Sequence, residues 1–119
     1  MIDRQMFYDK GARIHPGLDN EVLVHEEPGR AGAFLVIRGW GDDHGSFTEQ
    51  WRIQEPEGRT LYESSPREIH VATNGHVEKL EDEVADLDFD FAGDGYTVAF
   101  LLDDREVARA RFEVKVDGR

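Results

Sequence analysis

The sequence predicts one mainly β domain, an antiparallel sandwich of about seven to eight short strands. Apolar and polar residues alternate along several segments, most clearly over 86–91 and 106–116, and a period of two is typical of strands with one buried face. Turn-forming clusters of Gly, Asp and Pro separate these segments at regular intervals, as in all-β folds. With 119 residues, the chain is long enough to bury one hydrophobic core without disulfides or metal.

The first elements differ in the strength of their pattern. Residues 1–20 show little periodicity and are expected to form a loosely ordered N-terminal arm, so that 21–119 is the single β-sandwich domain. A short strand is expected at 21–25. Residues 33–40 are nearly all apolar, as expected of a central strand buried on both faces, and a turn cluster follows at 41–45.

The middle of the chain predicts further strands and one helix. Segment 46–54 alternates, a turn at 55–58 follows, and 59–63 is expected as its hairpin partner. Another short strand is expected at 68–72. Residues 76–84 instead place apolar side chains at helical spacing with acidic residues between them, which predicts at most one short helix here.

The last third carries the clearest alternation. Residues 86–91 alternate strictly between acidic and apolar side chains, 96–102 is the next expected strand, and a tight turn at 103–104 leads into 106–116. The outward positions of this last expected strand hold Arg109, Arg111 and Lys115. They could pair across strands with the acidic stripe at 86, 88 and 90, or with an acidic partner. The same alternation also fits a small closed β-barrel, which is the alternative fold.

Two stretches resemble immunoglobulin-like domains. The stretch 93–98, GDGYTV, is similar to the entry of the penultimate strand of that fold, where a Tyr after a turn closes a tyrosine corner. Trp51, which precedes the turn at 55–58, is similar to the central Trp of the same fold. The resemblance covers residues 31–116 as a pattern, as in small bacterial proteins of unknown function, and identifies no specific family. It implies the sandwich architecture and no particular activity.

Composition narrows the partners and the chemistry. Lys and Arg total 14 against 26 Asp and Glu, a formal net charge of −12. Such a surface repels phosphate groups and anionic lipids, so no nucleic-acid and no membrane partner is expected, and basic partners or cations are favoured. The Lys-poor usage indicates a bacterial or archaeal source, and the lack of a signal core or membrane span indicates a cytoplasmic protein. There is no cysteine, which excludes disulfides and thiolate chemistry, and no cofactor is expected.

An aromatic face offers a candidate ligand site. Phe47 and Trp51 share one face of the 46–54 segment, and Glu49 lies between them. Burial of that face would disfavour the charged form of Glu49, as in a general acid or base, although a Glu paired with an Arg is the simpler interpretation. The candidate ligand-binding residues are Phe34, Trp40, Phe47, Glu49 and Trp51.

Loop acids offer a candidate metal site. Hard cations such as Ca²⁺ need several oxygen ligands that converge on one point, and acidic loops at one end of a sandwich could supply them. The candidate ligands are Asp42, Asp43, Asp94, Asp103 and Asp104, and ordinary turn aspartates are the simpler interpretation. The histidines of the sequence show no recognised metal-ligand spacing.

The sequence favours a non-catalytic protein-interaction or accessory module, alone or as a homodimer that uses exposed sheet edges. A small-molecule binder with an aromatic-lined pocket and a Ca²⁺-dependent module are the alternatives. An enzyme is the least favoured class, because the sequence contains no GxSxG context and no glycine-rich phosphate loop.

Overall fold

The computed structural model describes the backbone of residues 2–9 and, with side chains, most of the rest of the chain. The ranges described with side chains are 20–26, 28–40, 44–73, 75–76 and 78–116. Over these ranges every regular element is a β-strand, which confirms the mainly β prediction. None of the described segments is a helix that could cross a bilayer.

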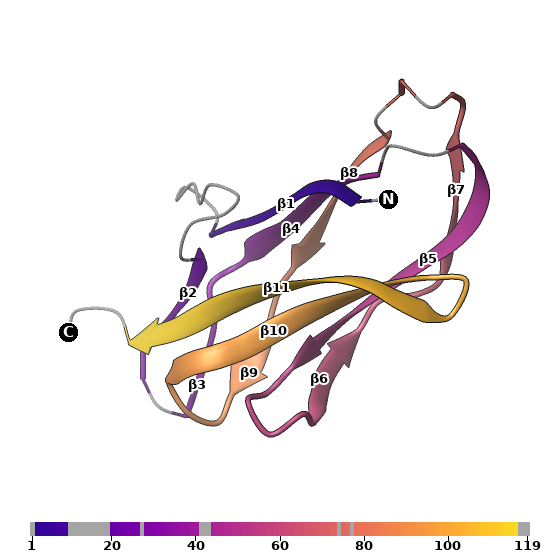
Figure 1. Cartoon of the computed structure of the whole chain (residues 1–119). Coiled ribbons are helices and arrows are strands. Elements are labelled where there is room, and N and C mark those ends of the chain that lie inside the picture. The colour runs from indigo at the N-terminus through magenta and orange to yellow at the C-terminus, as the bar shows by residue number, and fades with distance from the viewer. Residues whose placement is uncertain are drawn as a thin grey trace.

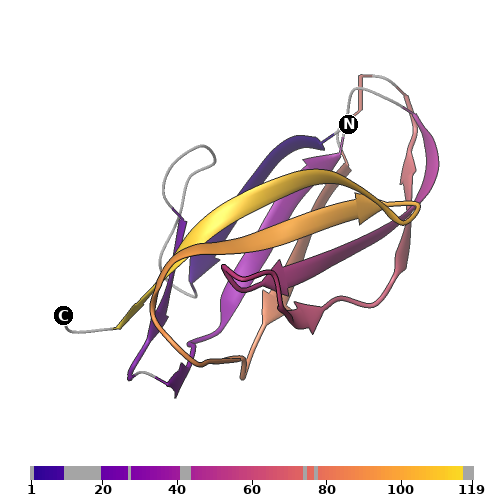
Figure 2. The same ribbon diagram turned by 60° about the horizontal axis from the view of Figure 1, so that its bottom comes forward.

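The strands form two facing layers (Figures 1 and 2). Along the chain they are β1 (Ile2–Asp9), β2 (Asn20–Val24), β3 (Gly29–Arg30), β4 (Phe34–Trp40), β5 (Gly45–Gln54), β6 (Thr60–Glu63), β7 (Arg67–Val71), β8 (Glu78–Val84), β9 (Asp88–Phe89), β10 (Gly93–Leu102) and β11 (Arg105–Val116). One layer has the order β1-β4-β8. The other has the order β2-β11-β10-β5-β6, with β7 also paired to β5. The short pair β3–β9 lies at the lower end in Figure 1.

The core lies between the two layers, on the inward positions of the alternating strands. Tyr96 and Phe100 of β10 are fully buried, and Phe112 and Val114 of β11 lie beside them. The rings of Phe89 and Tyr96 meet edge to face, with centroids 5.3 Å apart. Burial of each large apolar side chain contributes about 1.5–3 kcal/mol. The apolar residues at the inward positions, which the alternation in the sequence predicted, therefore hold the two layers together.

The larger sheet is mixed rather than antiparallel throughout. β2 pairs with β11 in parallel, from Asn20↔Phe112 to Val24↔Val116, and a parallel pair needs a long crossover, which the intervening strands supply. The sheets do not close on themselves, so the barrel alternative was wrong. Alternation is the same in a sandwich and a barrel, and only the pairing of strands distinguishes them.

The helix expected at 76–84 was wrong, because residues 78–84 form strand β8. β8 pairs with β4 from Phe34↔Val84 to Trp40↔Glu78. Leu80 and Val84 are four residues apart, and this spacing suits a helix and also a strand, since four is a multiple of two. Pairing with β4 selects the strand.

The segment 1–20, expected as a loose arm, contains strand β1. The backbone of β1 pairs with β4 from Ile2↔Trp40 to Asp9↔Phe34. Residues 10–19 lie outside the described residues. β4 thus has a neighbour on each side, which is the central position that its apolar sequence predicted.

Candidate functional site

A charged cluster lies inside the sandwich, where β4 faces β5. Arg38 takes an inward position of β4 and Glu49 takes one of β5, and their side chains are 0% and 2% exposed. Arg38 donates from Nε to Glu49 Oε2 at 2.8 Å and from Nη2 to Oε1. Trp40 Nε1 also donates to Glu49 Oε2. Both oxygens of this carboxylate are therefore engaged, in the bidentate geometry that suits a guanidinium.

Asp82 of β8 extends this cluster toward the surface. Arg38 Nη1 lies 2.9 Å from Asp82 Oδ2, and Trp51 Nε1 donates to the same oxygen at 2.9 Å. Arg67 of β7 donates to Asp82 Oδ1 at 3.0 Å. Burial alone would raise the pKa of Asp82, but the Trp51 hydrogen bond and the two arginines outweigh it and hold this pKa below its ordinary value. Asp82 is therefore ionised at neutral pH and ties β8 to both β5 and β7.

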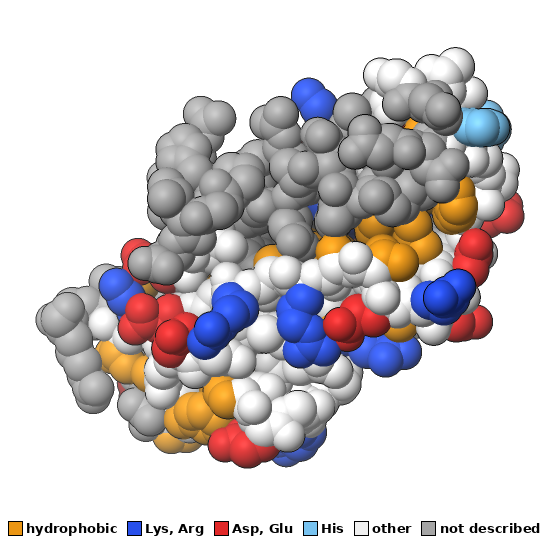
Figure 3. All heavy atoms as spheres, in the orientation of Figure 1, with side chains coloured by type: hydrophobic (Ala, Val, Ile, Leu, Met, Phe, Trp, Pro, Cys, Tyr) orange, Lys and Arg blue, Asp and Glu red, His pale blue; other side chains and the backbone are white. Residues whose placement is uncertain are grey.

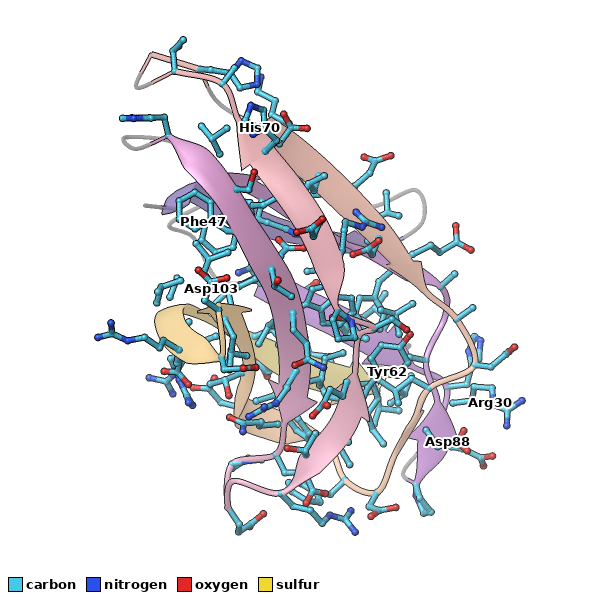
Figure 4. All side chains as sticks on the ribbon, turned by 90° about the vertical axis from the view of Figure 1, so that its right-hand side faces the viewer. Arg30, Phe47, Tyr62, His70, Asp88 and Asp103 are labelled. Atoms are coloured by element: carbon cyan, nitrogen blue, oxygen red, sulfur yellow. The ribbon has the colours of Figure 1, made fainter. Side chains whose placement is uncertain are left out.

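A pocket of about 250 Å³ opens beside the cluster. Figure 4 shows this side of the molecule, with Tyr62 on the strand β6. We call it the Tyr62 pocket, and its lining consists of Glu49, Trp51, Tyr62, Arg67, Asp82 and Glu83 with the 64–66 segment. β5, β6, β7 and β8 all contribute to it, so the pocket joins the edges of the two layers.

The walls of the Tyr62 pocket are fixed by contacts among themselves and with β5. The Tyr62 ring stacks on Trp51, with centroids 5.4 Å apart and planes at 29°. Ser64 Oγ accepts from the Trp51 N–H at 2.9 Å, and Gln50 Nε2 donates to the Ser64 carbonyl at 2.9 Å. Tyr62 is 39% exposed, so part of the residue remains accessible from outside. The pocket is polar, ordered and walled on one side by an aromatic ring.

The candidate ligand residues do not form one site. Glu49 and Trp51 line the Tyr62 pocket. Phe34 and Trp40 are fully buried in the core, and Phe47 is half-buried, nearer the start of β5. In the described part of the chain these five residues therefore do not line one aromatic pocket, and the two at the Tyr62 pocket lie beside polar neighbours.

The described candidate metal ligands do not converge. Asp94 lies at the start of β10, whereas Asp103 and Asp104 follow its end, so the length of the strand separates them. Asp42 and Asp43 lie outside the described residues. Within the described part of the chain, no group of three or more His, Asp or Glu side chains could hold a metal ion.

Several residues of the pocket and cluster escaped the sequence analysis. Asp82 stands in the segment expected as a helix, and Tyr62 and Arg67 carried no pattern that points to binding. A signal for Arg38 was present, because it is a charged residue in the nearly apolar run 33–40. A charge in a buried strand needs a partner of opposite sign. That signal predicts a buried acid but not which one.

Basic side chains also gather on the outward face of β11, where they alternate with acidic ones across the surface in Figure 3. The ion pairs here join Arg109 to Glu106, Arg111 to Asp94 and Lys115 to Glu21, at 2.7, 3.5 and 3.0 Å. The acidic stripe at 86, 88 and 90 that the sequence suggested as their partner pairs instead with Arg30 and Arg59. Such exposed pairs contribute about 0–1 kcal/mol each.

The chain matches no protein-family model and no curated protein. Among solved structures, it is similar to the Pseudomonas fluorescens alkylpurine DNA glycosylase AlkC bound to DNA containing an abasic site analog. The sequence identity is 12%, the TM-score is 0.50, and the match covers 97% of this chain and 30% of that chain. The likeness is one of fold, and a shared fold does not by itself carry a function.

This match corrects the expectation of no nucleic-acid partner. That expectation took the net charge of −12 as a bar to phosphate groups. The matched structure is a DNA glycosylase bound to DNA, so the exclusion was wrong. Net charge is too coarse a criterion, because contacts to DNA are made by the local side chains that face the phosphates.

Proposed function

We propose that the chain is a non-catalytic interaction module and that the Tyr62 pocket holds its ligand. The observation that carries this proposal is the preset shape of the pocket. Hydrogen bonds fix Trp51, Asp82 and Ser64 relative to one another in the free protein. A preorganised site loses little side-chain entropy on binding, and a few fixed polar groups beside an aromatic wall are typical of ligand sites.

The acids beside the pocket support binding rather than proton transfer. Glu49 accepts hydrogen bonds from Arg38 and Trp40 at its two oxygens. Asp82 accepts from Trp51 at one oxygen and from Arg67 at the other. A general acid or base must exchange a proton with a reacting group, and these carboxylates already serve fixed donors. Their role in the proposal is to position the pocket wall.

We also infer that the two layers form an immunoglobulin-like sandwich. Tyr96 Oη donates to the Phe91 carbonyl at 2.7 Å, and this contact supports a tyrosine corner. Trp51 lies buried on the core face of a strand that runs into a hairpin, as the central Trp of that fold does. The parallel β2–β11 pair is a local departure from the antiparallel pattern. An architecture of this class leaves function to the site that it carries.

Thermal unfolding in the presence of small amines, amino acids, sugars and carboxylates tests the pocket. A ligand that binds only the folded chain raises the melting temperature. We expect at least one class to do so for the native chain and not for Ser65→Trp, which places a large side chain at the pocket. Thr73→Trp, an exposed substitution away from the pocket, is the matched control and should respond as the native chain does. A shift that survives in Ser65→Trp, or no shift with any class, would overturn the proposal.

A second candidate function is contact with DNA, which the bound DNA of the matched glycosylase favours. The residues that would face phosphates are Arg109, Arg111 and Lys115 on β11. Phosphate groups would then replace their present acidic partners. Fluorescence anisotropy of a labelled duplex measures this: we expect binding that weakens as salt rises and is lost in Arg109→Glu/Arg111→Glu. A duplex that stays free at low ionic strength would exclude it.

A further inference from the structure

The charges that line the Tyr62 pocket do not cancel. Glu49 is neutralised by Arg38, with which it forms two hydrogen bonds. Asp82 is neutralised by Arg67, at 3.0 Å. Glu83 remains, an exposed residue of β8 at the pocket. Among the described residues, no hydrogen bond or ion pair occupies its carboxylate. Counted over the described residues, the pocket therefore carries one uncompensated negative charge.

The aromatic wall of the pocket also favours a positively charged ligand. Tyr62 stacks on Trp51 and is 39% exposed, so part of its ring remains accessible. The face of an aromatic ring is electron-rich and attracts cations. A planar guanidinium can stack flat on such a face and still donate hydrogen bonds from its edge to a carboxylate. An ammonium group lacks this combination.

The size of the pocket limits the ligand. Sites for drug-sized molecules measure about 300–1,000 Å³, and the Tyr62 pocket measures about 250 Å³. It therefore suits the end of a side chain better than a whole cofactor. The net charge of −12 draws basic molecules toward the surface and speeds their encounter.

We propose that the Tyr62 pocket binds the guanidinium of an arginine side chain, presented by a basic segment of a partner protein. The guanidinium stacks on the accessible part of the Tyr62 ring and pairs with the Glu83 carboxylate. Arg67 also lines the pocket, but Asp82 holds its charge, and Arg38 is wholly buried. This inference rests on the proposed function, because it names the ligand of the same pocket.

Three blocked tripeptides test the inference by NMR titration of the native chain: Gly-Arg-Gly, its citrulline analogue and Gly-Glu-Gly. Citrulline keeps the shape of arginine and removes the charge. We expect the arginine peptide alone to shift backbone amide signals of residues 62–67 and 82–83. Glu83→Gln is expected to weaken binding by about two- to fivefold, and Tyr62→Ala by about the same factor.

Glu81→Gln is the matched control, because it removes the same charge two residues earlier on the exposed side of β8. It should leave the affinity within error of the native value. Equal weakening by Glu81→Gln and Glu83→Gln would overturn the inference, since it would show a diffuse attraction to an acidic surface. Equal binding of citrulline would also overturn it.

The titration separates this inference from the proposed function. If Gly-Glu-Gly shifts the pocket signals and the arginine peptide does not, the cation preference is wrong and the pocket remains a binding site. If no tripeptide and no compound of the thermal series affects the pocket, both proposals fail together.

Discussion

Arg38 and Glu49 are buried charges whose contribution to stability depends on their being present together. Moving each ion into the protein interior costs several kcal/mol. Two parallel hydrogen bonds and the Trp40 indole offset that cost. Because the partners stand on β4 and β5, in different layers, the pair also sets how one layer lies over the other.

Glu49→Gln is expected to destabilise the fold by about 3–5 kcal/mol, because it removes the buried carboxylate that holds the Arg38 guanidinium and leaves only the partly exposed Asp82 as its counter-ion. The double variant Arg38→Met/Glu49→Leu is expected to recover most of this loss, since apolar side chains of similar volume replace both charges. The Trp40 indole loses its acceptor and Asp82 keeps only Arg67 as a cationic partner, so a cost of about 1–3 kcal/mol would remain. Urea unfolding followed by tryptophan fluorescence measures all three chains. A double variant no more stable than the single one would contradict this account.

Asp82 predicts a dependence of stability on pH. Its pKa is lower in the folded chain than the ordinary value of 3.8 that applies when unfolded. Its contribution is therefore complete above that value and is lost as pH falls through the lower, folded value. Asp82→Asn is expected to cost about 1–2 kcal/mol at neutral pH, with the difference from the native chain shrinking below about pH 4. Unfolding curves at a series of pH values measure it, and a constant difference down to strong acid would contradict the prediction.

At the scale of elements, the tight turn of the β10–β11 hairpin also makes a tertiary contact. Asp103 and Asp104 have φ of 50° and 66°, the backbone of a type I′ turn, whose twist matches that of the strands. The sequence predicted a tight turn here. It did not predict that Asp103 Oδ1 accepts from the Thr48 N–H at 2.9 Å, which fastens the turn to β5.

The two turn positions should respond differently to glycine. Asp104→Gly is expected to stabilise the fold by about 0.5–1 kcal/mol, because glycine adopts positive φ without steric cost. Asp103→Gly removes the hydrogen bond to Thr48 along with the strain, and no gain is expected. Melting temperatures of the two variants compare them directly. An equal gain at both positions would show that the Thr48 contact contributes nothing.

Alternation predicted the strands whose two faces differ most. β5 and β11 alternate between buried or half-buried apolar positions and more exposed polar ones, whereas β10 is buried on both faces over 96–102. All three strands appear where expected. The sequence missed β8 because its apolar residues fit both the helical period and the strand period. One of its inward positions also holds the charged residue Asp82. β1 was missed because it shows little alternation. Pairing with β4 forms both strands, and pairing is a tertiary effect.

At the scale of the whole molecule, the candidate site depends on which strands face each other. Trp51 and Asp82 are 31 positions apart in the sequence, yet they share a hydrogen bond in the pocket wall. Periodicity indicates which face of a strand is buried and leaves open which strand lies opposite. The sequence could therefore place Glu49 on an inward face but could not supply Arg38 as its partner.

The position of β11 has a consequence for how the chain is made. Among the described strands it comes last along the chain, yet it lies between β2 and β10 in the larger sheet. On the ribosome, the facing edges of β2 and β10 stay unpaired until Val116 has left the exit tunnel, and unpaired edges invite pairing with other chains. Protease resistance of ribosome-bound chains of increasing length should therefore rise in one step, when residues 105–116 emerge. A gradual rise, strand by strand, would mean that the layer β1-β4-β8 forms before β11 is in place.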